Sequence, residues 1–159
     1  MMPAVILAML AALVLTGCQQ RPAPQFQVEQ SRSYDVSKET AWNDVLAFLR
    51  ANDIAVSNAD LATGVIEARR DNYQDSGWAY CEPAMVRDHS SGNARLRRAR
   101  IFLGRSLELR IDVREVGDMV QVAPDAQFTE GQINMFKNLP FDAPCRSTGV
   151  LEKALLDAI

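Results

Sequence analysis

Apolar residues recur at helical spacing in the first third of the chain. Four of them fall at i, i+3, i+4 and i+7: Trp42, Val45, Leu46 and Leu49. This spacing predicts an amphipathic helix with one buried stripe. Ser37 is the expected N-cap, and Glu39 lies in the first turn, where the helix dipole favours a carboxylate. The helix is expected to end near Asn52.

The C-terminal residues show the same periodicity. Their apolar positions are Val150, Leu151, Ala154, Leu155 and Ala158. This pattern predicts a second helix at the end of the chain, with Ser147 as its expected N-cap.

Alternation of apolar and polar residues predicts the strongest strand, over residues 107–113. Its odd-numbered residues are apolar and its even-numbered residues are charged. The pattern predicts a sheet with one buried face and one solvated face. A separate strand near residues 99–103 is expected to pair with this one.

Gly117 and Asp118 predict a turn into the next strand. That strand is expected over residues 119–122 and is expected to resume at residues 126–128. Pro124 interrupts it and has no N–H to donate to a sheet, which indicates an edge strand or a bulge.

Shorter β-prone runs lie near the predicted first helix. Residues 33–36 predict a strand before it, and residues 54–57 and 64–68 predict a hairpin with its turn over residues 58–63. Together the elements predict one α+β domain in the order β-α-β-β-β-β-α. Its two helices are expected to pack on one face of an antiparallel sheet.

An apolar run over residues 4–15 ends in Leu15-Thr16-Gly17-Cys18. Small residues directly before a cysteine, after such a run, resemble the lipobox of bacterial lipoproteins. The resemblance implies a signal peptide over residues 1–17, cleavage before Cys18, and acylation of Cys18 with palmitate-type chains. The run is shorter than a spanning helix requires and fits a signal peptide.

Residues 1–17 contain no Lys or Arg, which departs from the usual positive start of a signal peptide. A translation start upstream and an atypical signal are both open explanations. An ordinary secreted signal and a buried N-terminal helix are the alternatives to a lipoprotein. By the lipoprotein sorting rule, Gln19 after the cysteine implies the outer membrane, with the domain facing the periplasm.

Residues 18–31 predict the lipidated cysteine and a flexible tether, because residues 19–31 contain two prolines and few apolar residues. Residues 32–159 are expected to form a single periplasmic domain. The net charge of -3 argues against a nucleic-acid-binding protein. It also provides no general attraction to an anionic membrane, so membrane attachment is expected to come from the lipid.

Cysteine usage agrees with an oxidising compartment. The chain has three cysteines, and lipidation of Cys18 leaves Cys81 and Cys145. In the periplasm this pair predicts one disulfide. The functional alternative is a reactive thiol at Cys81 with His89, the only histidine, as its base.

A basic segment without an intervening acid contains five arginines: Arg95, Arg97, Arg98, Arg100 and Arg105. It is a candidate contact for lipid headgroups, lipopolysaccharide phosphates or an acidic partner. The alternative is a solvated strand and loop. Residues 71–92 are predicted to be a solvated loop, and the spacing of their acids matches no known metal site. No metal or other cofactor is expected.

A resemblance to a known family rests on four short segments. They are residues 34–37 (Tyr-Asp-Val-Ser), the helix around Trp42, residues 54–56 (Ile-Ala-Val) and residues 63–66 (Thr-Gly-Val-Ile). These resemble the helix-grip repeat of BamC-type lipoproteins, which are accessories of the machinery that assembles outer-membrane β-barrels. The resemblance implies a helix-grip-like fold. This chain differs in having one such domain and a predicted disulfide.

The sequence contains no phosphate-binding glycine loop, nucleophile elbow or zinc-protease motif, so the chain is expected not to be an enzyme. These features predict a lipid-anchored periplasmic protein that acts as an interaction or accessory module in envelope assembly or secretion. An envelope protein is the expected partner. The alternative is a protein that binds a small apolar ligand or lipid between helix and sheet.

Overall fold

The domain is an α+β structure built on an antiparallel sheet. The computed structural model describes residues 24–74, 77–82, 86–88, 95–97, 100–134 and 138–159. The strands of the main sheet are β1 (Arg32–Tyr34), β2 (Ala55–Asp60), β3 (Val65–Asp71), β4 (Ala79–Tyr80), β7 (Arg100–Val116), β8 (Met119–Asn134) and β9 (Leu139–Ser147). The helices are α2 (Lys38–Ala51) and α3 (Val150–Leu156), and β5 (Val86–Asp88) pairs with β6 (Arg95–Arg97).

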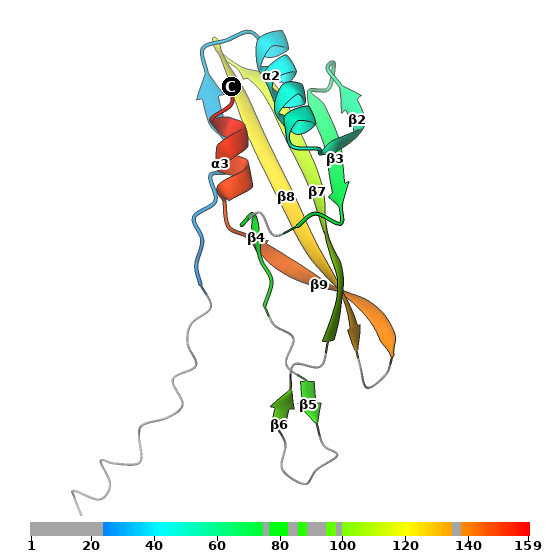
Figure 1. The fold of residues 1–159 in the computed structure, drawn as a ribbon. Coiled ribbons are helices and arrows are strands. Elements are labelled where there is room, and N and C mark those ends of the chain that lie inside the picture. Colours follow the sequence, from blue (N-terminus) through cyan, green and yellow to red (C-terminus); the bar gives the residue numbers. More distant parts are fainter. Residues whose placement is uncertain (1–23, 75–76, 83–85, 89–94, 98–99, 135–137) are drawn as a thin grey trace, which may run out of the picture.

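The sheet follows the order β2-β3-β7-β8-β9-β4, and β1 also pairs with β8. Figure 1 shows α2 and α3 on the same face of this sheet, over its upper half. The predicted antiparallel sheet with two helices on one face is therefore confirmed. The strand count was underestimated, because β4, β5, β6 and β9 were not predicted.

Residues 100–116 form one long strand, so the expected separation of a strand near 99–103 from the strand at 107–113 is wrong. A bulge between Phe102 and Gly104 shifts the register of β7 against β8 without ending the strand. Beyond the bulge the ladder continues, and the hydroxyls of Ser106 and Thr129 are hydrogen-bonded across the strands at 2.5 Å. A glycine between two apolar runs is typical of a turn. Here Gly104 lies in the bulge, with a φ of +139°.

Strand β8 is also continuous, and its single proline, Pro124, fits the pattern of pairing. The N–H of Val113 donates to Gly64 in the turn before β3, so by alternation Pro124 on β8 points its nitrogen away from β7. On the side of β8 that faces away from β7, the pairing with β1 extends to Val122. The pairing with β9 begins at Phe128. Pro124 therefore lies in a gap between two partner strands, which agrees with its predicted edge character.

The core lies between the helices and one face of the sheet. The buried positions of β7 are Leu107, Leu109, Ile111 and Val113, as the alternation predicts. On α2, Ala41, Trp42, Val45 and Leu49 are buried. Ser37 is the N-cap of α2, and its hydroxyl accepts the N–H of Thr40 at 3.1 Å. Leu46, which was expected in the buried stripe, is only partly buried, and the other predictions for this helix are confirmed.

Helix α3 begins two residues later than its predicted N-cap requires. Gly149, with a φ of +82°, occupies the N-cap position, and the Ser147 hydroxyl instead donates to Glu152 at 2.6 Å. Val150 was expected in the buried stripe but is half exposed, whereas Leu156 is fully buried. Ala154 and Ala158, also expected in the stripe, are exposed, so the buried apolar side chains of this helix are Leu151, Leu155 and Leu156.

The segment after β3 is not the solvated loop that was predicted. Tyr73 and Trp78 are both buried, and their rings lie 5.7 Å apart between centroids. The Tyr73 ring also contacts Phe128 of β8. The loop therefore contributes two aromatic side chains to the core before it enters β4.

Residues 26–31, which were predicted to belong to a tether, lie against the domain. The ring of Phe26 is 5.8 Å from that of Tyr80, and Arg32 forms an ion pair with Glu29 at 2.7 Å. The Gln121 amide donates to the hydroxyl of Ser31 at 3.3 Å. The predicted tether of residues 18–31 is therefore too long at its C-terminal end, because residues 26–31 belong with the domain.

Candidate interaction groove

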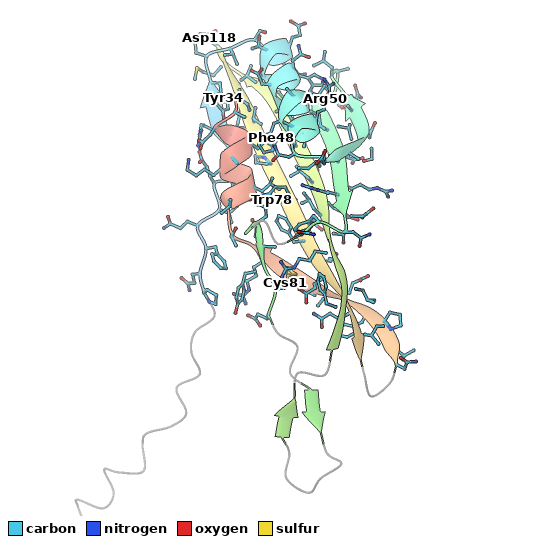
Figure 2. All side chains as sticks on the ribbon, viewed as in Figure 1. Tyr34, Phe48, Arg50, Trp78, Cys81 and Asp118 are labelled. Carbon is cyan, nitrogen blue, oxygen red and sulfur yellow. A yellow bond between two sulfur atoms is a disulfide. The ribbon has the colours of Figure 1, made fainter. Side chains whose placement is uncertain are left out.

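A surface groove of about 410 Å³ lies at the end of the domain where the β7–β8 turn meets the start of α2. Its lining residues are Val36, Ser37, Lys38, Glu39, Leu61, Glu115, Gly117, Asp118, Met119 and Val120. Figure 2 shows Asp118 at the top of the molecule, far from Cys81 near its middle. We refer to this feature as the polar-rimmed groove.

Two turns and one helix end build the polar-rimmed groove. The N-terminus of α2 supplies Lys38 and Glu39, the β2–β3 turn supplies Leu61, and Met119 is the first residue of β8 after the β7–β8 turn. Leu61 and Met119 are 40% and 38% exposed, and Val116 beside them is 55% exposed. Apolar side chains that are partly open to solvent and surrounded by charges resemble the composition of a protein interface.

The β2–β3 turn is held firmly in place. Strand β2 extends to Asp60, so the turn spans residues 61–64 and is shorter than predicted. Hydrogen bonds from the Thr63 side chain and from the N–H groups of Ala62 and Thr63 hold the pKa of Asp60 below its usual range. The N–H of Val113 donates to Gly64 at 2.7 Å, which fixes the turn to β7.

Gly64 is required at this contact. Its φ is +74°, and a Cβ at this position would lie 2.2 Å from the carbonyl oxygen of Val113. Leu61 is therefore presented by a backbone that has little freedom to move. The rim contains one Lys and three acids, Glu39, Glu115 and Asp118, so it favours a partner with a basic group.

The predicted disulfide is present. Cys81, directly after β4, is bonded to Cys145 on β9, 64 residues further along the chain. Because both sulfur atoms are in this bond, Cys81 has no thiol to act as a nucleophile. The proposed base His89 and the lipidation residue Cys18 lie outside the described residues.

The basic segment is only partly described. Arg105 forms an ion pair with Glu130 at 3.2 Å, and its side chain is 16% exposed. This contact leaves little of Arg105 for an anionic partner. Arg98 lies outside the described residues, and the side chains of Arg95, Arg97 and Arg100 are not described.

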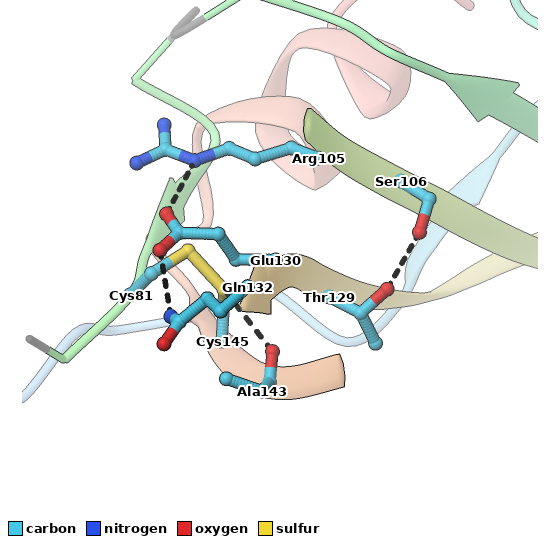
Figure 3. The surroundings of a disulfide bond; sticks show 8 residues. All are labelled: Cys81, Arg105, Ser106, Thr129, Glu130, Gln132, Ala143 and Cys145. Carbon is cyan, nitrogen blue, oxygen red and sulfur yellow. Dashed lines mark hydrogen bonds and ion pairs between the residues drawn. A yellow bond between two sulfur atoms is a disulfide. The ribbon is translucent and has the colours of Figure 1, made fainter. Parts of the chain in front are cut away.

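A buried polar cluster beside the disulfide was missed in the sequence. Figure 3 shows Glu130 and Gln132 next to Cys81 and Cys145. The Gln132 amide donates to Glu130 at 2.8 Å, and both side chains are almost fully buried. Glu152 is also buried. Polar residues at every second position of a strand, such as Glu130 and Gln132, predict a solvated face. The sequence therefore gives no sign that this cluster is buried.

Within the described residues, no set of three His, Cys, Asp or Glu side chains is arranged to hold a metal ion. In the same part of the chain, no helix has the length and apolar character needed to cross a membrane. No model of a known protein family matches the chain, and no curated protein matches it.

Proposed function

We propose that this protein is a lipid-anchored envelope module without catalytic activity, which binds a protein partner through the polar-rimmed groove. The observation that carries the proposal is the position of the groove. It lies at one end of the domain, and from Arg32 back to Phe26 the chain runs away from that end. An anchored domain would present this end to the periplasm.

The chemistry of the groove defines the partner. Leu61 and Met119 offer apolar contact, and the acidic rim offers ion pairs to a basic side chain. We infer that the partner presents an apolar side chain flanked by Lys or Arg, as an interface with an apolar centre and a polar rim requires.

The outer-membrane location and the helix-grip relationship belong to the same proposal. The lipobox and Gln19 support the location. The order β1-α2-β2-β3 and the placement of both helices on one sheet face support a helix-grip-like domain. Membership of the barrel assembly machinery is one form that the partnership could take.

The test combines anchoring with cross-linking. Replacement of Cys18 by Ser is expected to move the protein from the membrane to the soluble fraction. A photo-reactive amino acid at position 116 is expected to form an adduct in cells at native expression. The same amino acid at position 108, on the solvated sheet face, is the control.

The adduct should disappear when Leu61→Asp or Met119→Asp is added, because either change places a charge in the apolar part of the groove. An adduct that survives both changes would assign the contact to another surface. Membrane association that persists unchanged in Cys18→Ser would refute the lipid anchor.

The alternative of a small apolar ligand between helix and sheet gains no support from the described residues. Trp42, Val45 and Leu49 of α2 pack directly with the buried face of β7 in one core cluster. Native mass spectrometry of the purified protein would still detect a retained ligand and would favour this alternative.

A further inference from the structure

The end of the sheet opposite the polar-rimmed groove carries large apolar side chains that the helices do not cover. We define the distal ribbon as residues 100–106 of β7, 128–134 of β8 and 139–145 of β9, which pair with one another. Its exposed apolar side chains are Phe102 (57%), Leu103 (50%), Leu139 (58%) and Phe141 (39%). Figure 1 shows this ribbon projecting beyond both helices.

Three of these side chains share one face of the distal ribbon. Phe102, Gln132 and Phe141 are partners in one row across the three strands. Directly paired residues of an antiparallel sheet point to the same face, and Leu139 shares that face because it lies two residues from Phe141. Gln132 in the middle of the row is fully buried, so the exposed part of this face consists of two phenylalanines and a leucine.

The base of the distal ribbon is braced. Next to this row, Arg105 and Glu130 form an ion pair, and Gln132 donates to Glu130 (Figure 3). The disulfide ties β9 to the segment after β4 at the same level. The apolar surface is thus held on a structured support.

The N-terminal segment runs toward the distal ribbon. Arg32 pairs with Val122 on β8, whereas Phe26 contacts Tyr80, the partner of Arg146 at the end of β9. From residue 32 back to residue 26, the chain follows β8 toward its distal end. Figure 1 shows this segment descending beside α3.

The short distance along the chain limits how far the domain can stand from a membrane. Phe26 is eight positions after Cys18, and this length of chain can span at most about 28 Å. The distal ribbon extends six residues beyond Cys145 to Leu139, which corresponds to about 20 Å at the rise of a strand. The length of the distal ribbon is therefore most of the largest distance that the tether allows between Phe26 and the membrane.

We propose that the distal ribbon docks on the surface of the bilayer that holds the acyl chains of Cys18, with Phe102, Leu139 and Phe141 in the interfacial region. The proposal rests on the lipid anchor proposed above. Apolar side chains at an interface add binding strength to an acyl anchor, and basic residues add attraction to anionic lipids. The arginine-rich segment of the sequence leads directly into β7 at Arg100.

The test uses the acylated full-length protein in vesicles of phosphatidylethanolamine and phosphatidylglycerol, prepared with or without brominated acyl chains. Phe102→Trp places a fluorophore in the distal ribbon, and Val116→Trp is the matched control. Both positions are on β7 and are similarly exposed, at 57% and 55%. The native residues Trp42 and Trp78 are buried, and the parent protein measures their constant background.

Brominated lipid is expected to quench the added fluorescence at position 102 and to leave that at position 116 unchanged. Leu139→Trp is the second reporter and should behave like Phe102→Trp. With two reporters, the test still works if one of the variants does not fold. Co-sedimentation with the vesicles reports the anchor independently.

If the variants co-sediment but neither reporter is quenched, docking is wrong and the anchor stands. If they do not co-sediment, both the anchor and the docking that rests on it are overturned. A lack of quenching together with a dimeric mass in detergent would assign the surface to a second copy of this chain.

Discussion

Arg32 joins the N-terminal segment to the C-terminal end of α3. Its guanidinium donates to both carboxylate oxygens of Glu29 at 2.8 and 2.7 Å. It also donates to the carbonyl of Leu156 at 3.0 Å and to Asp157 at 2.9 Å. A cation at this end of a helix interacts favourably with the helix dipole and with the last carbonyl groups. Tyr34 donates to the same Leu156 carbonyl, and burial raises the pKa of Tyr34.

The pKa of Glu29 tests this contact. Hydrogen bonds from Arg32 hold the pKa of Glu29 below its ordinary value of 4.5. A carboxyl with a depressed pKa in the folded state stabilises the fold at pH values above 4.5, and the contribution is lost as pH falls through the folded pKa. We expect Arg32→Gln to raise the pKa of Glu29 toward its ordinary value in an NMR titration.

Asp60 is the internal control for this titration. Its pKa is lowered by hydrogen bonds within the β2–β3 turn, so it should stay unchanged in Arg32→Gln. An unaltered Glu29 in that variant would mean that the N-terminal segment does not contact Arg32 in solution.

Helix α3 offers two apolar positions with opposite environments. Leu155 is fully buried, whereas Val150 is 49% exposed. Leu155→Ala is expected to lower the free energy of unfolding by about 2–5 kcal/mol, because it removes buried methyl groups and leaves a cavity. Val150→Ala should change it by less than about 0.5 kcal/mol. Urea denaturation of both variants checks this, and equal losses would place the helix in a different rotation.

At the scale of elements, the disulfide ties the segment of the short strand β4 to β9. That strand has two residues, and its pairing among the described residues is with Arg146 and Ser147 of β9. Replacement of both Cys81 and Cys145 by Ser is expected to lower the free energy of unfolding by roughly 2–4 kcal/mol, because the bridge closes a long loop of the unfolded chain.

A local measurement distinguishes this effect from general destabilisation. The N–H of Thr148 donates to the carbonyl of Trp78 at 3.0 Å, next to β4. Its hydrogen exchange should accelerate more in the double variant than that of Val113 in the centre of β7. A double variant as stable as the oxidised parent would show that the bridge does not form.

The elements that could be predicted from the sequence are those with a local period. Helix α2 has an N-cap and an apolar stripe, and residues 107–113 alternate strictly, so local rules suffice. Strand β9 was missed because it contains Pro140 and Pro144. Both prolines are paired with residues of β8 whose N–H groups point to β7. The proline nitrogens therefore point to the outer edge of β9, where the sheet needs no hydrogen-bond donor.

The candidate site was less predictable than the fold. The polar-rimmed groove combines the start of α2 with two turns that lie far apart in the sequence, and no motif links Leu61 to Met119. The distal ribbon likewise depends on register, because only pairing places Phe102 and Phe141 on either side of Gln132. The disulfide is the exception, because counting cysteines was enough to pair Cys81 with Cys145.

At the scale of the whole molecule, the two candidate surfaces lie at opposite ends of one long hairpin. Phe102 and Val116 are fourteen residues apart on β7, which corresponds to about 45 Å along a strand. With the distal ribbon on the bilayer, the polar-rimmed groove would stand at most about this far above it. The rigidity of the hairpin, and not the length of the tether, would then set the height.

Lengthening the tether separates these two determinants. A Gly/Ser spacer of about twelve residues between Ala23 and Pro24 adds about 20 Å of average reach. With a fluorophore on Val116→Cys and acceptor lipids in the vesicle, energy transfer should stay the same when the spacer is added to the parent protein. In Phe102→Asp/Leu139→Asp, which prevents docking, the spacer should lower energy transfer. A drop of equal size in both backgrounds would show that the tether alone sets the height of the groove.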